Sequence, residues 1–297
     1  MESSDRNALI ALPVAVLAGV GIAWAGSQGS APVLVGAAAI PAFALAVALA
    51  FVIQWVAFAI AYVQQTETFY DLTGSITYVS VTTLIALTQP QDMDDRAVLL
   101  LALVVVWSTR LGTYLFNRIL KTGKDERFDE LKVSFIQFLQ TWTLQGLWVT
   151  FTAAAAWGAI TTETPQPLGI FALVGFLIWA FGFGFEMLAD AQKNAFKADP
   201  ANEGDFIDTG LWSWSRHPNY FGEIVIWIGV AVIALPVLQG WRYVTLISPV
   251  FVTLLLTQVS GIPILEEKAD ERWGGQEDYE AYKERTPVLI PRPPGQG

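Results

Sequence analysis

Residues 211–238 read LWSWSRHPNYFGEIVIWIGVAVIALPVL, a polar and aromatic turn that runs directly into an apolar stretch. Pro218 suits the first turn of a helix, because the N–H that proline lacks would have no partner there. The stretch from Tyr220 to Leu238 approaches the roughly 20 residues that a helix needs to cross the hydrocarbon of a bilayer. The segment therefore predicts a helix that leaves an aqueous boundary and enters a membrane.

The composition of the whole chain indicates the same class of protein. Of its 297 residues, 54% are hydrophobic and 15% are charged, whereas soluble domains carry about 25% charged residues. The mean hydropathy is +0.46. These values exclude a typical soluble globular protein. We expect an all-α fold, namely a polytopic helical membrane protein with seven to eight transmembrane helices and functional loops on the cytoplasmic side.

Windows with few or no charges predict the spans. The windows are Ala8–Gly26, Ala31–Val63, Leu72–Leu87, Ala97–Arg118, Ser134–Ile160, Leu168–Asp190, Tyr220–Leu238 and Tyr243–Leu265. The number falls from eight to seven if one window does not cross, or if the first is a signal peptide that ends at Ala23-Trp24-Ala25. All lysines lie in three segments, residues 121–132, 193–197 and 268–283, which should share the cytoplasmic side. Both termini are then cytoplasmic, and Arg96 and Arg242 lie outside.

Several classes of partner are excluded by residue counts. The net charge is -10 and no basic tract is present, so we expect no nucleic acid as a partner. The chain has no cysteine, which rules out disulfides and thiolate ligands. His217 is the single histidine, so no histidine cluster exists to hold zinc or iron, and we expect no metal.

Charges within the predicted spans are candidate functional groups, because ionisable side chains in hydrocarbon are costly. Glu186, Asp190, Lys193 and Lys197 recur at steps of four, three and four, which places them on one helical stripe. Stacked carboxylates repel unless a ligand with hydroxyl or amide donors binds them. The alternative is a helix-end pair with snorkelling lysines. Arg110 is a further charge inside a predicted span.

The turn before Pro218 is a candidate anion site. Arg216, His217 and the first free backbone amides of the following helix converge at a positive helix terminus, which favours a group such as phosphate. The alternative is an interfacial aromatic belt with a basic anchor. In the tail, Glu266-Glu267 follow the last span, and Tyr279 and Tyr282 lie three residues apart on one helical face. A charged juxtamembrane helix without function would look similar.

Together these motifs resemble the C-terminal signature of the steroid 5-alpha-reductase family. The likeness rests on RHPNYFGE at 216–223, on Glu266-Glu267 and on residues 279–291, and Tyr70-Asp71-Leu72-Thr73-Gly74 is similar to a segment of bacterial members. It covers most of the chain after about Phe69. The wider group includes sterol C14 and C7 reductases and isoprenylcysteine carboxyl methyltransferase, whose Arg-His-Pro turn and Glu-Glu pair are similar. Glu223 directly after Gly222 and the acidic stripe are more reductase-like.

The resemblance implies an NADPH-dependent reductase that delivers a hydride to the beta carbon of a 3-oxo-delta-4 steroid or a similar apolar enone. The resemblance implies that Asp190, Asn219 and Glu223 match the family positions that hold the adenosine, ribose and nicotinamide portions of NADPH. It also implies that the cytoplasmic loops bind the cofactor. Lys197 stands near the phosphates, and Glu267 aligns roughly with a position that varies among members. The residues that we expect to bind NADPH are Arg110, Arg127, Glu186, Asp190, Lys193, Lys197, Trp212, Ser215, Arg216, His217, Asn219, Tyr220, Glu223, Glu267, Tyr279 and Tyr282.

The catalytic candidates follow from the charge that develops on the carbonyl oxygen, which requires a hydrogen-bond donor or acid. In the family the donors are a Glu and a Tyr. Asp71 falls about where the Glu is expected, with Tyr70 before it, and the Tyr position falls near Trp107, whose indole cannot transfer a proton as a phenol can. A protonated Asp71 could act as the acid. The side chains that could substitute in space are Tyr62, Tyr78 and Tyr114.

We expect one integral membrane domain over residues 1–297, with substrate-cavity helices in 1–120 and cofactor-binding helices, loops and a cytoplasmic C-terminal helix in 121–297. An apolar steroid-like substrate enters from the membrane lipid into a monomer in the bacterial inner membrane, with the cofactor site facing the cytoplasm. Two rival functions stay open. One is an S-adenosylmethionine-dependent methyltransferase on the same scaffold, and the other is a non-catalytic lipid- or sterol-binding membrane protein.

Overall fold

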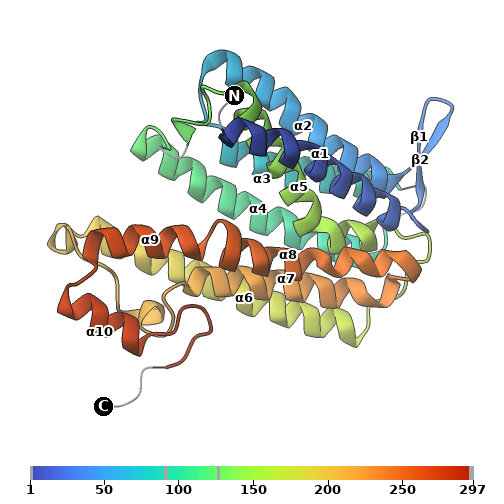
Figure 1. Ribbon diagram of the computed structural model, residues 1–297. Helices are drawn as coiled ribbons and strands as arrows, with labels where there is room; N and C mark the ends of the chain where they lie inside the picture. Colours follow the sequence, from blue (N-terminus) through green and yellow to red (C-terminus); the bar gives the residue numbers. More distant parts are fainter. Residues whose placement is uncertain (1–2, 90–92, 126–127, 294–297) are drawn as a thin grey trace. The chain divides into compact units, whose positions relative to one another are not determined.

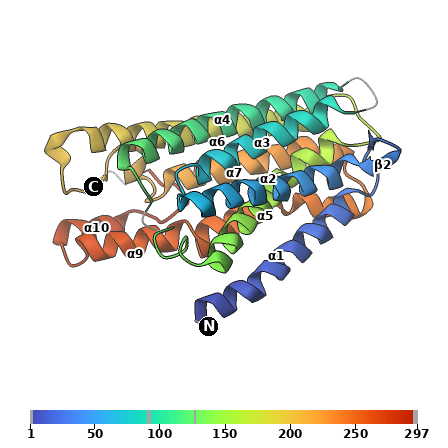
Figure 2. The same cartoon turned by 90° about the horizontal axis from the view of Figure 1, so that it is seen from above.

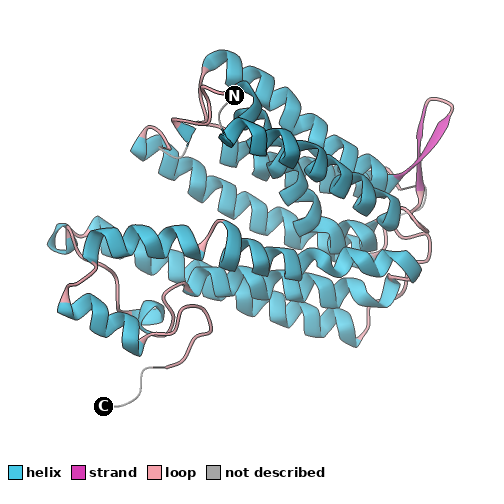
Figure 3. Cartoon of the chain, viewed as in Figure 1, coloured by secondary structure: helices cyan, strands magenta, loops and turns pink. Residues whose placement is uncertain are grey.

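The computed structural model describes residues 3–89, 93–125 and 128–293, and helices make up 76% of it (Figures 1 and 3). The α-helices are α1 Ser3–Gly26, α2 Ala42–Gln64, α3 Tyr70–Leu87, α4 Asp95–Thr122, α5 Phe135–Ile160, α6 Ile170–Ala198, α7 Pro218–Ala234, α8 Ile247–Leu254, α9 Ile262–Trp273 and α10 Glu277–Arg285. Short 3-10 turns join several of them, and a π-helical turn, Leu255–Val259, follows α8. The fold is therefore nearly all helix.

A two-stranded antiparallel hairpin departs from the all-α prediction. Its strands are β1 Pro32–Val35 and β2 Ala38–Pro41, paired from Pro32↔Pro41 to Val35↔Ala38. The sequence predicts one apolar window from Ala31 to Val63, but the structure divides this window into the hairpin and α2. Gly36 adopts a φ of 61° at the turn, which glycine reaches without steric cost. Pro41 then precedes the first residue of α2.

In the part of the chain that the structure describes, six helical segments are long and apolar enough to span a membrane. They are Ser4–Gly26, Ala42–Gln64, Asp95–Leu120, Ile170–Ala198, Pro218–Val237 and Gly240–Trp273. The windows Leu72–Leu87 and Ser134–Ile160 also form helices, α3 and α5, but they are not among the six, so the predicted count of seven to eight spans is not confirmed. Thr, Ser, Gln and Trp side chains make α3 and α5 less apolar, and many of these side chains are buried inside the protein.

The chain separates into two compact units. The first comprises Met1–Ala172 with Ile233–Ser248, and the second comprises Leu173–Val232 with Pro249–Gly297. The functional boundary at residue 120 stays a prediction, and it differs from this structural division. In the first unit α5 packs against α1, α2, α3 and α4. Its core side chains include Phe138, Trp142 and Trp157, each fully buried.

Two buried arginines hold helix ends together in the first unit. Arg96 donates to the backbone carbonyls of Ile233 at 2.6 Å and Pro167 at 2.9 Å. Arg242 donates to the carbonyl of Gly29 at 2.9 Å, to the hydroxyl of Thr162 at 2.9 Å and to the carbonyl of Gly158. These are the two basic residues assigned to the outside. Their hydrogen-bond partners are mainly backbone carbonyls, which lack internal partners at helix ends and in turns.

Glycines allow α6 and α7 to pack closely in the second unit. A Cβ atom on Gly222 would lie 2.8 Å from Glu186 Cβ, and one on Gly182 would lie 2.7 Å from the Gly222 carbonyl oxygen. Gly229 makes the same kind of approach to Trp179. Gly182 therefore belongs to a helix packing face.

Candidate functional site

A cleft of about 580 Å³ lies within the second unit, between the end of α6, the following loop, the turn before α7, and helices α9 and α10. Its walls combine basic, acidic and aromatic side chains. They are Lys193, Phe196, Lys197, Asn202, Glu203, Gly204, Asp205, Phe206, Ile207, Trp212, Arg216, His217, Leu265, Glu266, Lys268, Ala269, Arg272, Trp273, Tyr279 and Tyr282. The volume falls within the roughly 300–1,000 Å³ of small-molecule sites.

The cleft is positive in a strongly acidic protein. Five lysines and arginines face three carboxylates in its walls, which leaves an excess of two positive charges when His217 is neutral. The chain as a whole carries a net charge of -10. A concave site with the opposite sign to the rest of the molecule attracts and orients an anionic ligand.

A triad of Arg216, Glu266 and His217 stands at the turn before α7, with an ion pair between Arg216 and Glu266 and a hydrogen bond between His217 and Glu266. Arg216 Nη2 lies 2.9 Å from Glu266 Oε2, and His217 Nε2 lies 2.7 Å from Glu266 Oε1. The His217 ring stacks on the Tyr220 ring at 5.7 Å. Arg216 Nε is buried and has no hydrogen-bond partner among the described residues. Glu266 therefore holds the Arg216 side chain in the wall of the cleft.

The chain after α10 clamps the same turn. The backbone N–H groups of Arg216 and His217 donate to the carbonyls of Pro287 at 2.9 Å and Val288 at 3.1 Å. The Ser215 hydroxyl, which is fully buried, donates to the Leu289 carbonyl at 2.9 Å. These two backbone N–H groups are consequently used within the protein. The anion-site prediction concerns the first amides of the following helix, and these hydrogen bonds do not involve them.

Aromatic side chains line the cleft and fix one another. Lys193 Nζ lies 4.6 Å above the Trp212 ring, a cation–π contact. The Tyr282 hydroxyl donates to the Trp212 carbonyl at 2.8 Å, and the Phe206 ring lies 5.2 Å from Tyr279 and 5.4 Å from Tyr282. Burial raises the pKa of both Tyr279 and Tyr282 above the ordinary value. Both phenols thus stay protonated, and flat aromatic faces are presented for a planar ligand.

Burial lowers the pKa of His217 below its ordinary value of 6.5, although Glu266 acts in the opposite direction and Lys193 and Arg216 add to the lowering. The imidazole is therefore neutral at pH 7, with Nε2–H donating to the carboxylate.

Below about pH 6.5 the unfolded chain binds a proton at His217 that the folded chain does not bind. The free energy of unfolding should therefore fall as the pH drops through this value towards the pKa of His217 in the folded protein. Melting temperatures measured from about pH 7.5 to about pH 5.5 should fall more for the natural protein than for His217→Gln. Parallel profiles would show that His217 is not the responsible group.

The structure brings part of the predicted cofactor set into this cleft. Seven of the predicted residues line it: Lys193, Lys197, Trp212, Arg216, His217, Tyr279 and Tyr282. Others lie in the same unit but outside the lining. Glu186 and Asp190 are buried on α6, Ser215 is bonded to the tail, and Tyr220 stacks on His217. Asn219 and Glu223 are half-buried on the first two turns of α7, and Glu267 is exposed while the preceding Glu266 lines the cleft.

The catalytic candidates and one predicted cofactor residue belong to the first unit. Arg118 Nη2 lies 3.4 Å from Asp71 Oδ2. The Tyr70 hydroxyl donates to the Thr141 carbonyl at 3.1 Å. The rings of Trp107 and Tyr78 meet edge to face at 5.3 Å. Tyr114 and Arg110 are half-buried on α4, and Arg127 lies outside the described residues.

Sequence reasoning missed one wall of the cleft. Lys268 and Arg272 are four residues apart on α9, next to Trp273, and the loop from Asn202 to Ile207 closes the same side. The i,i+4 spacing of the two basic residues is a signal that could have been found. The loop from Asn202 to Ile207 carries no such sequence signal, because its residues are typical of any exposed turn.

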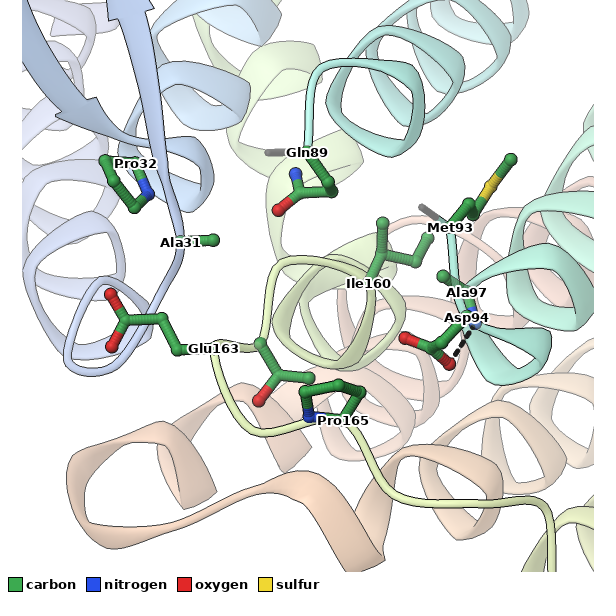
Figure 4. Close-up of a pocket in the computed structure, with 10 residues that line it drawn as sticks. Ala31, Pro32, Gln89, Met93, Asp94, Ala97, Ile160, Glu163 and Pro165 are labelled. Carbon is green, nitrogen blue, oxygen red and sulfur yellow. Dashed lines mark hydrogen bonds between the residues drawn. The ribbon is translucent and has the colours of Figure 1, made fainter. Parts of the chain in front are cut away.

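A smaller cavity of about 210 Å³ lies in the first unit (Figure 4). Its two carboxylates belong to Asp94 and Glu163, and Asp94 Oδ1 accepts from the backbone N–H groups of Arg96 and Ala97 as the N-cap of α4. None of the predicted site residues lines this cavity. Among the described residues, no group of three or more His, Cys, Asp or Glu side chains could hold a metal ion. The cleft in the second unit is therefore the candidate functional site.

The fold and the site define a multi-pass membrane protein with a positive, aromatic-lined cleft. The profile of the family described as "Protein of unknown function (DUF1295)" matches residues 57–286. The chain therefore belongs to this family, which is part of the steroid 5-alpha-reductase and sterol reductase-like membrane superfamily.

Three curated relatives are similar over parts of the chain. An uncharacterized protein of Schizosaccharomyces pombe is 26% identical over 168 residues, which cover 46% of this chain and 48% of the relative. A Delta(14)-sterol reductase of Mus musculus is 29% identical over 93 residues, or 27% of this chain and 22% of the relative. A protein of Ustilaginoidea virens named as a probable O-methyltransferase is 31% identical over 83 residues, or 28% of each chain. The chain thus spans less than half the length of these relatives. No solved structure matches it.

Proposed function

We propose that the protein is an NADPH-dependent membrane reductase that acts on an apolar enone of the 3-oxo-delta-4 steroid type. The observation that carries this proposal is the positive cleft in which Lys193, Lys197 and Arg216 face aromatic walls. The mouse relative is named a sterol reductase, which agrees with this reaction class. The distribution of lysines supports a cleft that faces the cytoplasm, where the cofactor is available.

The residues of the cleft fit NADPH by charge and by shape. Its pyrophosphate and 2′-phosphate require several cationic donors, which the five basic side chains of the lining could supply. Its adenine and nicotinamide rings suit the flat faces of Trp212, Phe206 and Trp273. S-adenosylmethionine has no phosphate and carries a positive sulfonium, so the positive excess favours NADPH over this methyl donor.

When bound, NADPH supplies the hydride. The protein must then stabilise negative charge on the carbonyl oxygen of the substrate and deliver a proton to the product. Asp71 is paired with Arg118, whereas Tyr78 presents a phenol beside Trp107, near the position where the family has its Tyr. A phenol can donate a hydrogen bond and also transfer its proton. We therefore assign the donor role to Tyr78, with Asp71 and Arg118 as a polar pair on the neighbouring turns of α3 and α4.

Ligand binding and turnover separate this function from its rivals. NADPH at about 100 times its Kd should stabilise the purified protein by about 2.7 kcal/mol, whereas S-adenosylmethionine should have little effect. Absorbance at 340 nm, a property of reduced nicotinamide, should fall when a steroid-like enone is added. Stabilisation by S-adenosylmethionine alone would favour the methyltransferase, and NADPH binding without turnover of any enone would favour a lipid-binding protein.

Substitutions of Tyr78 and Asp71 test which side chain is the hydrogen-bond donor to the substrate. Tyr78→Phe should lower kcat by about 100-fold or more, in line with the loss of a general acid, and leave the Kd for NADPH unchanged. Tyr243→Phe is the matched control, because it removes an exposed phenol from the same unit. If Asp71→Asn lowers kcat and Tyr78→Phe does not, the donor is Asp71.

A further inference from the structure

The hairpin of β1 and β2 is entirely apolar. From Ala31 to Phe43 the chain contains no charged or polar side chain. Leu34 is 75% exposed and Val35 is 51% exposed, and these neighbours point to opposite faces of the ribbon. Both faces are therefore apolar at the tip. In water, an exposed ribbon of this kind would be prone to association.

The hairpin is held at the end of two candidate membrane spans. α1 ends at Gly26, and α2 begins at Ala42 directly after Pro41, the last residue of β2. A four-residue strand extends about 13 Å, and the headgroup region on each side of the hydrocarbon is about 5–8 Å thick. With no linker between β2 and α2, the ribbon must begin at the boundary of the bilayer.

The direction of the hairpin keeps it at that boundary. Figures 1 and 2 both show it turned across the axes of α1 and α2 instead of continuing along them. Helices that span a bilayer run across its plane, so a ribbon turned across their axes leans towards that plane. The ribbon consequently stays close to the membrane surface along its length.

Exposed tryptophans mark the same end of the first unit as a membrane interface. Trp24, in the last turn of α1, is 54% exposed, and Trp241 is 60% exposed. Their ring centroids lie 5.2 Å apart. Pairs of exposed tryptophans at the end of a spanning helix are typical of the headgroup level. The hairpin begins eight residues after Trp24.

The backbone of the ribbon limits its depth. In the described part of the chain, β1 and β2 pair with each other and with no third strand. The outer edges therefore carry N–H and C=O groups that need water or lipid headgroups, and they cannot enter the hydrocarbon core. The side chains require an apolar medium and the edges a polar one. Only the boundary between headgroups and acyl chains supplies both.

From these constraints we propose that the hairpin Pro32–Pro41 is a lipid-binding element, immersed in the plane of the bilayer at the headgroup–acyl boundary. It fixes the depth of α1 and α2 at that end of the first unit. The partner is the lipid surface itself. A second copy of the chain, paired through an exposed strand edge, is the alternative that the experiment must exclude.

The absence of cysteine permits a clean test. Ala37→Cys places one thiol at the exposed turn, and Ala201→Cys places one in the exposed loop after α6. Each full-length variant is labelled with an environment-sensitive fluorophore and reconstituted in phosphatidylcholine vesicles. A spin label near the lipid headgroups should quench the label at residue 37 about twofold or more beyond that at 201, and aqueous iodide should show the reverse order.

Two results would overturn the proposal. One is iodide quenching at residue 37 equal to that at 201, since the hairpin would then lie in water. The other is energy transfer between labelled copies that persists on dilution with lipid, since a second copy would then cover it. Leu34→Asp changes an exposed side chain and should preserve the fold. In the labelled Ala37→Cys protein it should raise iodide access about twofold, and unchanged access would show that the apolar tip does not hold the hairpin in lipid.

Discussion

Arg216→Gln is expected to weaken NADPH binding by roughly 30- to 700-fold, which corresponds to about 2–4 kcal/mol. The substitution removes a partly buried cation from the wall of the cleft and leaves Glu266 facing the ligand with only His217 as its partner. Loss of the arginine therefore subtracts an attraction and adds a repulsion towards phosphate. Titration of the cofactor fluorescence against purified protein gives the Kd.

The control for this variant is Arg285→Gln. Arg285 forms an exposed ion pair with Asp208 at 2.8 Å, in the same unit but outside the lining of the cleft. Exposed pairs contribute little, so its Kd should change by less than about threefold. Equal losses in the two variants would mean that Arg216 acts through general charge and not through a contact in the cleft. The melting temperature of each variant without ligand shows whether the fold is intact.

Arg242→Met is expected to lower the free energy of unfolding by about 3–5 kcal/mol. Arg242 is 2% exposed, and its guanidinium donates to Gly29, Gly158 and Thr162. Methionine fills much of the same volume but leaves these three acceptors, two of them buried, without their donor. With total stabilities of about 5–15 kcal/mol, this loss is large, and the melting temperature should fall on the order of 10 °C.

Two further variants show whether hydrogen bonding causes this loss. Arg242→Lys keeps a cation with fewer donors and should be intermediate, because lysine lacks the planar fork that reaches several acceptors. Arg285→Met removes an exposed arginine and should shift the melting temperature by about 1 °C or less. A similar fall for Arg242→Met and Arg285→Met would contradict the role of the buried guanidinium.

Much of the cleft could be predicted from residues that are close in the sequence. The Arg216-His217-Pro218 turn indicated an anion site, and the α6 stripe led to Lys193 and Lys197, which line the cleft. The sequence does not show which of two adjacent glutamates, Glu266 or Glu267, faces the cleft. Glu267 was chosen on alignment, whereas Glu266 lines the cleft, because a rotation of one residue on α9 changes the face by about 100°.

The hydrogen bonds of the chain after α10 could not be predicted from the sequence. The carbonyls of Pro287 and Val288 accept from Arg216 and His217, about 70 residues earlier in the chain. Carbonyls are identical at every position, so the side-chain pattern carries no information about this pairing. The same holds for Arg242, whose partners include the carbonyls of Gly29 and Gly158.

The amino-acid sequence alone determined that the chain is helical and membrane-embedded, because long apolar runs can satisfy their backbone groups in hydrocarbon chiefly as helices. It also indicated the basic and aromatic groups that converge on the cleft. The tertiary structure alone decided where a helix gives way to the apolar hairpin, which helices are long and apolar enough to span, and which carbonyls hold Arg216 and Arg242. These features depend on contacts between residues far apart in the chain, and their energy appears only when the packed elements meet.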